Sequence, residues 1–321
     1  MSNPYKDLRW LLSGGVKDTI RQRNELKAQL AATQAELKKS QERVRLLGGN
    51  LSEHPLPFMM LVALPKSASA YLVEVLRRGL NIAYKEVACG YFPQDVMDYR
   101  KLNQFSAGNT LAKAHLDANP INMQLLKLHC PRMVLHLRDP RQALLSMVHH
   151  LKHCWDTGEL QYIQSWIAPA PPPAVLQGGL SGAIDWHLAH FLPNMLEWTE
   201  RWLAHAESGE SPRVLITHYH DLRENTQAVI ERILAFYEIP AWAFTPTDVP
   251  KDWSVHFRKG ELEEWREVFN RAQQEICSDL MADYPRVNRL YGSEKINQRT
   301  VTDNSENAIS HQLVNGSHQR R

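Results

Sequence analysis

The sequence predicts an α/β fold: a three-layer αβα domain with a central, mainly parallel sheet. An apolar run from Phe58 to Leu64 ends at Pro65, and apolar residues at helical spacing then continue to Leu80. This pattern is typical of a strand, a tight turn and a helix. A second buried strand, from Met133 to Arg138, is followed by Asp139-Pro140 and another helical pattern. Repeated strand–helix units favour a parallel sheet with helices on its faces.

The composition sets the limits of this fold. The chain has 321 residues, of which 43% are hydrophobic and 22% are charged, and its net charge is +2. This is enough for one large domain with appendages, and the small net charge gives no reason to expect nucleic acid as a partner. The four cysteines are widely spaced and form no CxxC pair, which indicates reduced thiols. Without a signal pattern or an apolar run of about 20 residues, we expect a soluble, cytoplasmic protein with no membrane span.

Residues 16–47 are the first predicted element, a helix with an imperfect heptad pattern. Six of its ten seam positions are apolar; those positions are Val16, Thr19, Arg23, Leu26, Leu30, Thr33, Leu37, Ser40, Val44 and Leu47. We expect residues 1–50 to form a coiled-coil extension that makes the protein a homo-oligomer. A helix that folds back on its own domain, or a lone charged helix, is the alternative.

The turn after the first strand has the features of an anion site. Small residues follow Lys66 and allow the backbone to come close to a ligand. The next helix directs free N–H groups and its positive dipole end at the turn, and Lys66 adds a full charge. The Gly-Lys-Ser/Thr sequence of a Walker A loop is absent. An ordinary turn with a solvated lysine would have the same pattern.

The next elements place further polar residues near the same edge. Further strands are predicted over 82–87 and 110–115. Arg138 ends the strand from Met133, and open α/β sheets bind ligands at this end of their strands. Asp139 is expected to cap the following helix, with Pro140 in its first turn. Ser146 lies about two turns into that helix.

The second half of the chain is predicted to be mainly helical. The proline-rich loop 156–182 is either a lid on the acceptor side or a surface excursion. A helix over 181–205, interrupted near Pro193, carries aromatic residues expected in the core, among them Trp198 and Trp202. A strand over 214–219, a helix over 226–237 and a final helix over 261–284 follow. We expect the tail, 293–321, to be disordered.

Five short motifs in this order resemble those of the PAPS-dependent sulfotransferases, where PAPS is 3′-phosphoadenosine 5′-phosphosulfate. Arg138 to Ser146 is similar to the family's 3′-phosphate motif, and Pro65 to Leu72 to its 5′-phosphosulfate loop. Lys113-Ala114-His115 resembles the segment with the catalytic base. The other two matches are Leu215 to Leu222, which resembles a strand ending in Tyr-Glu-Asp-Leu, and Arg258 to Trp265, which resembles the C-terminal Arg-Lys-Gly motif.

The resemblance implies a sulfotransferase domain at 55–292 with a P-loop NTPase-like fold. It implies transfer of a sulfuryl group from PAPS to the hydroxyl or amine of a small-molecule or glycan acceptor. Lys66 would stabilise the leaving phosphate, and His115 would be the general base. No metal is expected, since His149 and His153 lack further ligands. The donor site would comprise Lys66, Ser67, Ala68, Ser69, Ala70, Tyr71, Arg138, Ser146, Tyr219, Arg258, Lys259 and Gly260.

This chain departs from the family pattern at several positions. Ala68 stands where the family has glycine, which matters if that position needs a positive φ. Ala70 lacks the family's hydroxyl, and Tyr71 replaces a tryptophan. Glu263 replaces a glycine and is expected to bring negative charge close to the anion site. A non-catalytic scaffold with this fold, oligomerising through its coiled coil, is therefore one alternative, and a P-loop-type kinase is another.

Overall fold

A computed structural model of the protein describes residues 55–159, 167–249 and 259–292, together with helical stretches at 23–27, 29–30 and 33–34. The chain divides into two compact units, Met1–Leu56 and Pro57–Arg321. Most of the predicted coiled coil, 16–47, lies outside the described residues, as do Arg258 and the tail from 293. Leu26 and Leu30, two of the predicted seam residues, are exposed. Homo-oligomer formation through this segment stays a prediction.

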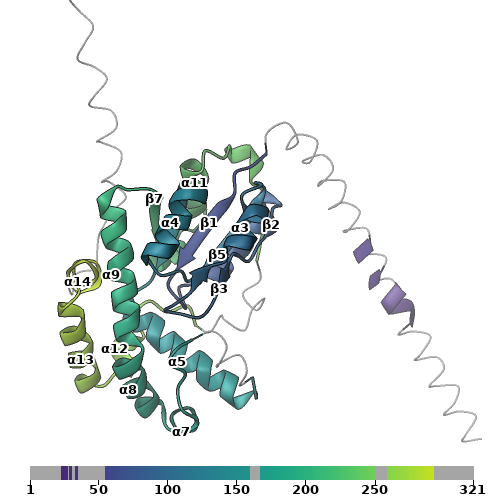
Figure 1. Ribbon diagram of the computed structural model, residues 1–321. Coiled ribbons are helices and arrows are strands. Elements are labelled where there is room, and N and C mark those ends of the chain that lie inside the picture. Colours follow the sequence, from purple (N-terminus) through teal and green to yellow (C-terminus); the bar gives the residue numbers. More distant parts are fainter. Residues whose placement is uncertain are drawn as a thin grey trace, which may run out of the picture. The chain divides into compact units, whose positions relative to one another are not determined.

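A five-stranded sheet forms the centre of the second unit (Figure 1). Its strands pair in the order β2-β5-β1-β6-β7, and every pair is parallel. This confirms the predicted mainly parallel sheet. The five strands are β1 (Met59–Ala63), β2 (Ala83–Tyr84), β5 (Thr110–Ala114), β6 (Arg132–Leu137) and β7 (Arg213–His218).

The strand predicted over 82–87 is much shorter than expected. Its sheet pairing ends soon after β2, where the Lys85 N–H donates to the carbonyl of Leu111. The chain then leaves the sheet and forms β3 (Ala88–Cys89), which pairs antiparallel with β4 (Val96–Met97).

Helices flank the sheet (Figure 1). Among the described helices, none is long and apolar enough to cross a membrane. The helical elements are α2 (Ser69–Leu80), α3 (Tyr99–Phe105), α4 (Pro120–His129), α5 (Pro140–Asp156), α7 (Pro173–Gln177), α8 (Leu180–His190), α9 (Leu192–Ser208), α10 (Tyr219–Glu224), α11 (Thr226–Phe236), η1 (Ala241–Ala243), α12 (Trp265–Val268), α13 (Arg271–Ala282) and α14 (Pro285–Tyr291).

Both faces of the sheet are buried, which is usual for parallel strands. Successive side chains of a strand point to opposite faces. On one face, Met60 and Val62 of β1 join a core that includes residues of α5, α8 and α9. Their neighbours Met59 and Leu61 are equally buried and face the other way, where α2 and α11 cover the sheet. The three-layer prediction is thereby confirmed.

The prediction of a single final helix over 261–284 is wrong. The chain forms α12 and α13 there, and α14 follows. The side chain of Asn270 accepts from the Gln273 N–H, and the Gln273 side chain accepts in return from the Asn270 N–H. This capping box starts a new helix at Arg271, because it satisfies N–H groups that a continuous helix would have used internally.

Candidate active site

The loop between β1 and α2 has a strained backbone. Lys66 and Ala68 both have positive φ, 63° and 65°. Ala68 occupies the N-cap position of α2 and makes no side-chain cap hydrogen bond, and the first bond of the helix runs from the Leu72 N–H to the Ala68 carbonyl. Left-handed residues in such a turn gather successive N–H groups into a concave anion-binding surface. The N–H groups of the first helical turn, which have no intrahelical acceptor, point to the same place.

Ser67 lies between the two left-handed residues and is fully buried. Its hydroxyl makes no hydrogen bond to any residue that the structure describes. A buried hydroxyl without a partner costs about 1–3 kcal/mol. A phosphate or sulfate oxygen would supply that partner, so the loop fits a ligand of this kind. Ser69, Ala70 and Tyr71 form the first turn of α2 beside it.

Arg138 directly follows β6 and joins three of the predicted segments. Its Nη1 donates to the carbonyl of Lys66 and its Nη2 to the carbonyl of Glu261, both at 2.8 Å. Its Cζ lies 3.9 Å from the ring centroid of Tyr219, the first residue of α10. The predicted strand over 214–219 therefore ends one residue earlier, at His218. Segments far apart in the sequence, each from one of the motifs, thus meet at this guanidinium.

The start of α5 has the predicted cap. Asp139 accepts a hydrogen bond from the Arg141 N–H at 2.9 Å, and Pro140 is the first helical residue. Asp139 also pairs with the Arg141 side chain, whose Cζ lies 4.0 Å from the ring centroid of Trp265. Ser146 lies further along α5, is partly exposed and takes no part in these contacts.

His115 directly follows β5, and its imidazole reaches the end of β1. Its Nδ1 lies 2.6 Å from the carbonyl oxygen of Ala63. Because a carbonyl can only accept, Nδ1 holds the hydrogen and the basic lone pair is on Nε2. Burial lowers the pKa of His115 to about 3, with a smaller effect of the nearby charges of Lys113 and Lys66. The imidazole is therefore neutral at pH 7.

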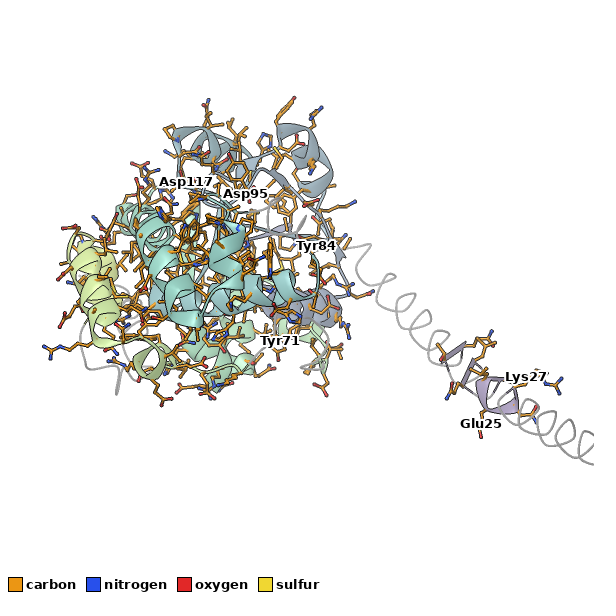
Figure 2. All side chains as sticks on the ribbon, turned by 90° about the horizontal axis from the view of Figure 1, so that it is seen from below. Glu25, Lys27, Tyr71, Tyr84, Asp95 and Asp117 are labelled. Carbon is orange, nitrogen blue, oxygen red and sulfur yellow. The ribbon has the colours of Figure 1, made fainter. Side chains whose placement is uncertain are left out.

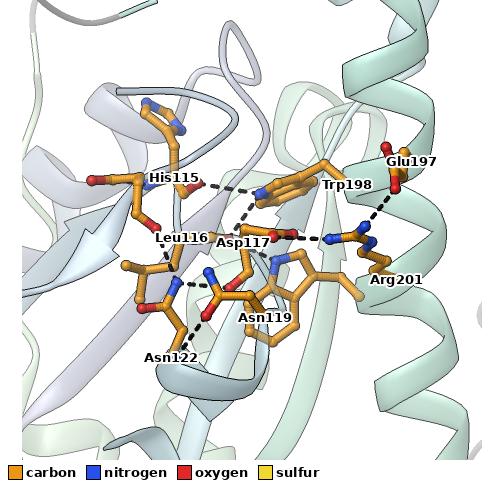
Figure 3. A network of polar contacts seen from close by, with 10 residues as sticks. His115, Leu116, Asp117, Asn119, Asn122, Glu197, Trp198 and Arg201 are labelled. Atoms are coloured by element: carbon orange, nitrogen blue, oxygen red, sulfur yellow. Dashed lines mark hydrogen bonds and ion pairs between the residues drawn. The ribbon is translucent and has the colours of Figure 1, made fainter. Parts of the chain in front are cut away.

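The backbone of His115 is fixed by residues that the sequence analysis did not assign to the site (Figure 3). The His115 N–H donates to Asp95 Oδ2 at 3.0 Å. The indole N–H of Trp198 lies 3.2 Å from the carbonyl of His115 and 2.8 Å from that of Leu116. Trp202, one turn later on α9, donates to the same Leu116 carbonyl at 2.8 Å. Both tryptophans are core residues, as predicted, and they also position the segment that contains His115.

Asn122 links the two sides of this segment. Its Nδ2 donates to the backbone carbonyls of Asp95 and Asp117, both at 2.9 Å, and its Oδ1 accepts from the Met97 N–H. Asp95 and Asp117 consequently lie close together (Figure 2). Burial raises the pKa of the Asp95 carboxyl, while the His115 N–H and the charge of Lys113 act in the opposite direction. Nothing in the local sequence around Asp95 indicated this role.

The C-terminal motif is only partly described, because Arg258 lies outside the described residues. Lys259 Nζ pairs with Glu264 Oε1 at 3.1 Å, and Gly260 has a φ of 74°. Glu263, expected to bring negative charge to the anion site, pairs instead with Arg266 at 3.2 Å. The carboxylate beside Lys259 is thus that of Glu264. The dipole expected from a long final helix is also absent here, since α12 has only 4 residues.

Comparison with known proteins identifies the class. The family model described as the sulfotransferase domain matches residues 20–294. The chain therefore belongs to the sulfotransferase family, which confirms the resemblance that the motifs indicated. Sulfotransferase 6B1 of Danio rerio is 21% identical to this chain over 248 residues, which are 69% of this chain and 76% of the relative.

Solved structures show more distant similarities. A mouse sulfotransferase complexed with PAP matches with a TM-score of 0.49 and 16% identity, and the match covers 74% of this chain and 88% of that one. A retinol dehydratase in complex with retinol and PAP matches with a TM-score of 0.46 and 15% identity, over 73% of this chain and 83% of that one.

Proposed function

We propose that this sulfotransferase transfers a sulfuryl group from PAPS to the hydroxyl or amine of a small-molecule or glycan acceptor. One observation carries the proposal. The side chains of His115 and Arg138, from two different motifs, contact the carbonyl of Ala63, which ends β1, and that of Lys66, in the loop after it. The candidate base, the phosphate loop and a buried arginine thus share one small region.

The donor's two ends would be bound by different groups. The loop backbone, Lys66 and residues Ser67 to Tyr71 would hold the 5′-phosphosulfate. Arg138 would provide charge for the 3′-phosphate, with Tyr219 orienting its guanidinium. Ser146, Arg258, Lys259 and Gly260 would complete that side. To bind a phosphate, Lys259 would have to share or leave its ion pair with Glu264.

The reaction moves one group and one proton. The bond between sulfur and the donor's phosphate oxygen breaks, and a bond between sulfur and the acceptor oxygen or nitrogen forms. Nε2 of His115 takes the acceptor's proton, which is typically worth about 10² to 10⁴ in rate. Lys66 stabilises the charge that builds on the leaving phosphate. The bound donor is anionic, so it favours protonated His115 and makes this imidazole a stronger base than in the free protein.

Calorimetric titration with adenosine 3′,5′-bisphosphate (PAP) and with AMP tests the donor site. We expect micromolar binding of PAP, weaker binding of AMP, and about a tenfold or greater loss of PAP affinity in Arg138→Ala. Arg132→Ala is the matched control, because Arg132 begins β6 and pairs with Glu238 at the opposite end of the same strand. Equal affinity for PAP and AMP, or equal losses in both variants, would contradict the proposal.

The alternative is a scaffold that keeps the fold without catalysis. The departures of the loop from the family pattern at Ala68 and Ala70 are what support this alternative. Sulfuryl transfer that is lost in Lys66→Ala and kept after deletion of residues 1–50 would exclude this alternative. If the wild-type protein does not bind PAP, the scaffold becomes the better interpretation.

A further inference from the structure

A histidine in the middle of the sheet contacts the phosphate loop. His136 lies on β6 and, like Thr217 of β7 beside it, is fully buried. Its Nε2 is 2.9 Å from the carbonyl oxygen of Ser67, and its Nδ1 is 2.8 Å from Oγ1 of Thr217. On its other side the strand register pairs His136 with Ala63 of β1, a small residue beside which a large ring fits.

These two contacts define which ring nitrogen holds the hydrogen. The Ser67 carbonyl can only accept, so Nε2 must donate to it. Nδ1 then accepts from the Thr217 hydroxyl. Both nitrogens are used by a neutral ring, and burial lowers the pKa of His136 to about 3. Thr217 therefore holds the tautomer that binds the loop.

The contact fixes the direction of a peptide group. Arg138 holds the carbonyl of Lys66, and His136 holds the next carbonyl, that of Ser67. In a planar trans peptide, the following N–H points away from the carbonyl. The hydrogen bond to the Ser67 carbonyl thus directs the N–H of Ala68 away from His136. Ala68 is the N-cap residue of α2.

We propose that His136 is a positioning residue of the phosphate loop, which orients the Ser67–Ala68 peptide so that its N–H binds the 5′-phosphate side of the donor. The inference rests on the proposed function. It explains how Ala68 keeps a left-handed conformation, because strained residues persist where the surroundings hold them. It also explains a polar ring in a strand whose other central residues, Met133 to Leu135, are apolar.

Two substitutions separate the two bonds of the ring. The amide nitrogen of glutamine reaches about as far as Nε2, so His136→Gln keeps a donor for the Ser67 carbonyl. The shorter side chain in His136→Asn reaches only the position of Nδ1 and keeps a partner for Thr217. Loss of one hydrogen bond to the loop corresponds to about a tenfold change in affinity. We expect His136→Asn to weaken the binding of PAP and of AMP by about this same factor, since both ligands carry the 5′-phosphate. His136→Gln should keep both affinities within about threefold of the wild-type values.

Urea unfolding of both variants provides the structural control. If both lose stability while their PAP affinity stays that of the wild type, His136 is only a core residue and the inference is overturned. NMR of ¹⁵N-labelled histidine gives a test that needs no ligand: the hydrogen of His136 should be on Nε2, and a hydrogen on Nδ1 would overturn the inference. Absence of PAP binding by the wild type overturns the proposed function, whereas a wild type that discriminates PAP from AMP with unaffected His136 variants overturns this inference alone.

Discussion

Two strand-to-helix junctions lie side by side at the same edge of the sheet, and their helices begin in opposite ways. At the β6–α5 junction, the carboxylate of Asp139 accepts from the backbone of the new helix. At the β1–α2 junction, Ala68 has no side chain that could cap, and its backbone is left-handed. The strands β1 and β6 are parallel neighbours, so the difference comes from the two turns.

The difference shows what makes a helix start available to an anion. The N-terminus of α5 is already satisfied by a negative charge of its own, and Arg138 supplies the positive charge there through its side chain. The N-terminus of α2 has no side-chain cap, and such a helix start favours an anion. The donor's two phosphates would therefore be bound by different means, one mainly by backbone and the other mainly by side chains.

A capping carboxylate at the β1–α2 junction, like that of Asp139 at the β6–α5 junction, should have the largest effect on donor affinity. We expect Ala68→Asp to lower PAP affinity at least about a hundredfold, because its carboxylate would occupy the anion site. Aspartate and asparagine both tolerate the left-handed conformation. Ala68→Asn is the uncharged control and should lose only about tenfold. Calorimetric PAP affinity of Ala68→Asp within threefold of the wild type would show that the free helix start is not the anion site.

Low pH should lower the free energy of unfolding through His136, the histidine that contacts the β1–α2 loop. The pKa of His136 in the folded protein, about 3, lies below its usual value of about 6.5. The unfolded chain therefore binds more protons between these values, and stability falls as the pH falls through this window. From pH 7 to pH 5 we expect His136 to account for about 2 kcal/mol of lost unfolding free energy.

Urea unfolding of the wild type and of His136→Gln at the two pH values measures this contribution. The variant should lose about 2 kcal/mol less than the wild type between pH 7 and pH 5. Equal losses in the two proteins would mean that His136 does not titrate as a neutral buried group.

Relieving the strain at Ala68 should have the smallest effect. A left-handed conformation costs an alanine roughly 1–2 kcal/mol, and glycine avoids this cost but loses about 0.5–1 kcal/mol more chain entropy on folding. We expect Ala68→Gly to raise the unfolding free energy by about 0.5–1 kcal/mol and to leave PAP affinity equal or slightly higher. A destabilised Ala68→Gly in urea unfolding would show that the positive φ is not strained in this loop.

Much of the fold was predictable from local patterns. The apolar runs ending at Pro65 and Arg138 marked two central strands, and Asp139-Pro140 marked the start of α5. The start of α13 was also predictable, since Asn270 and Gln273 have the spacing of a capping box. The apolar residues of this stretch recur at helical spacing on both sides of Asn270, and this pattern favoured one continuous helix instead. Choosing between Glu263 and Glu264 as the partner of Lys259 required the geometry of the short α12.

The supporting residues of the site were less predictable, because they act across the sheet. The local signal for His136 was its place as a histidine within an apolar strand. Its partners come from elsewhere in the sequence, because Ser67 follows β1 and Thr217 lies on β7. Asp95 and Trp198 bond to the backbone of His115 across 20 and 83 residues of sequence, and Trp202 bonds to the neighbouring Leu116 across 86. Only the three-dimensional arrangement relates them.

The paired indoles on α9 tie this helix to the segment that contains His115. Trp198 and Trp202 bond to the same carbonyl of Leu116 from successive turns of one helix. A slide or rotation of α9 would stretch these bonds, so a displacement of this helix would be passed on to the segment that contains His115. That segment directly follows β5, which pairs with β1 ahead of the β1–α2 loop, and the contact between His115 Nδ1 and the Ala63 carbonyl adds a second connection there. The distance between His115 and the β1–α2 loop is thus set by the sheet, and α9 braces the His115 side of it.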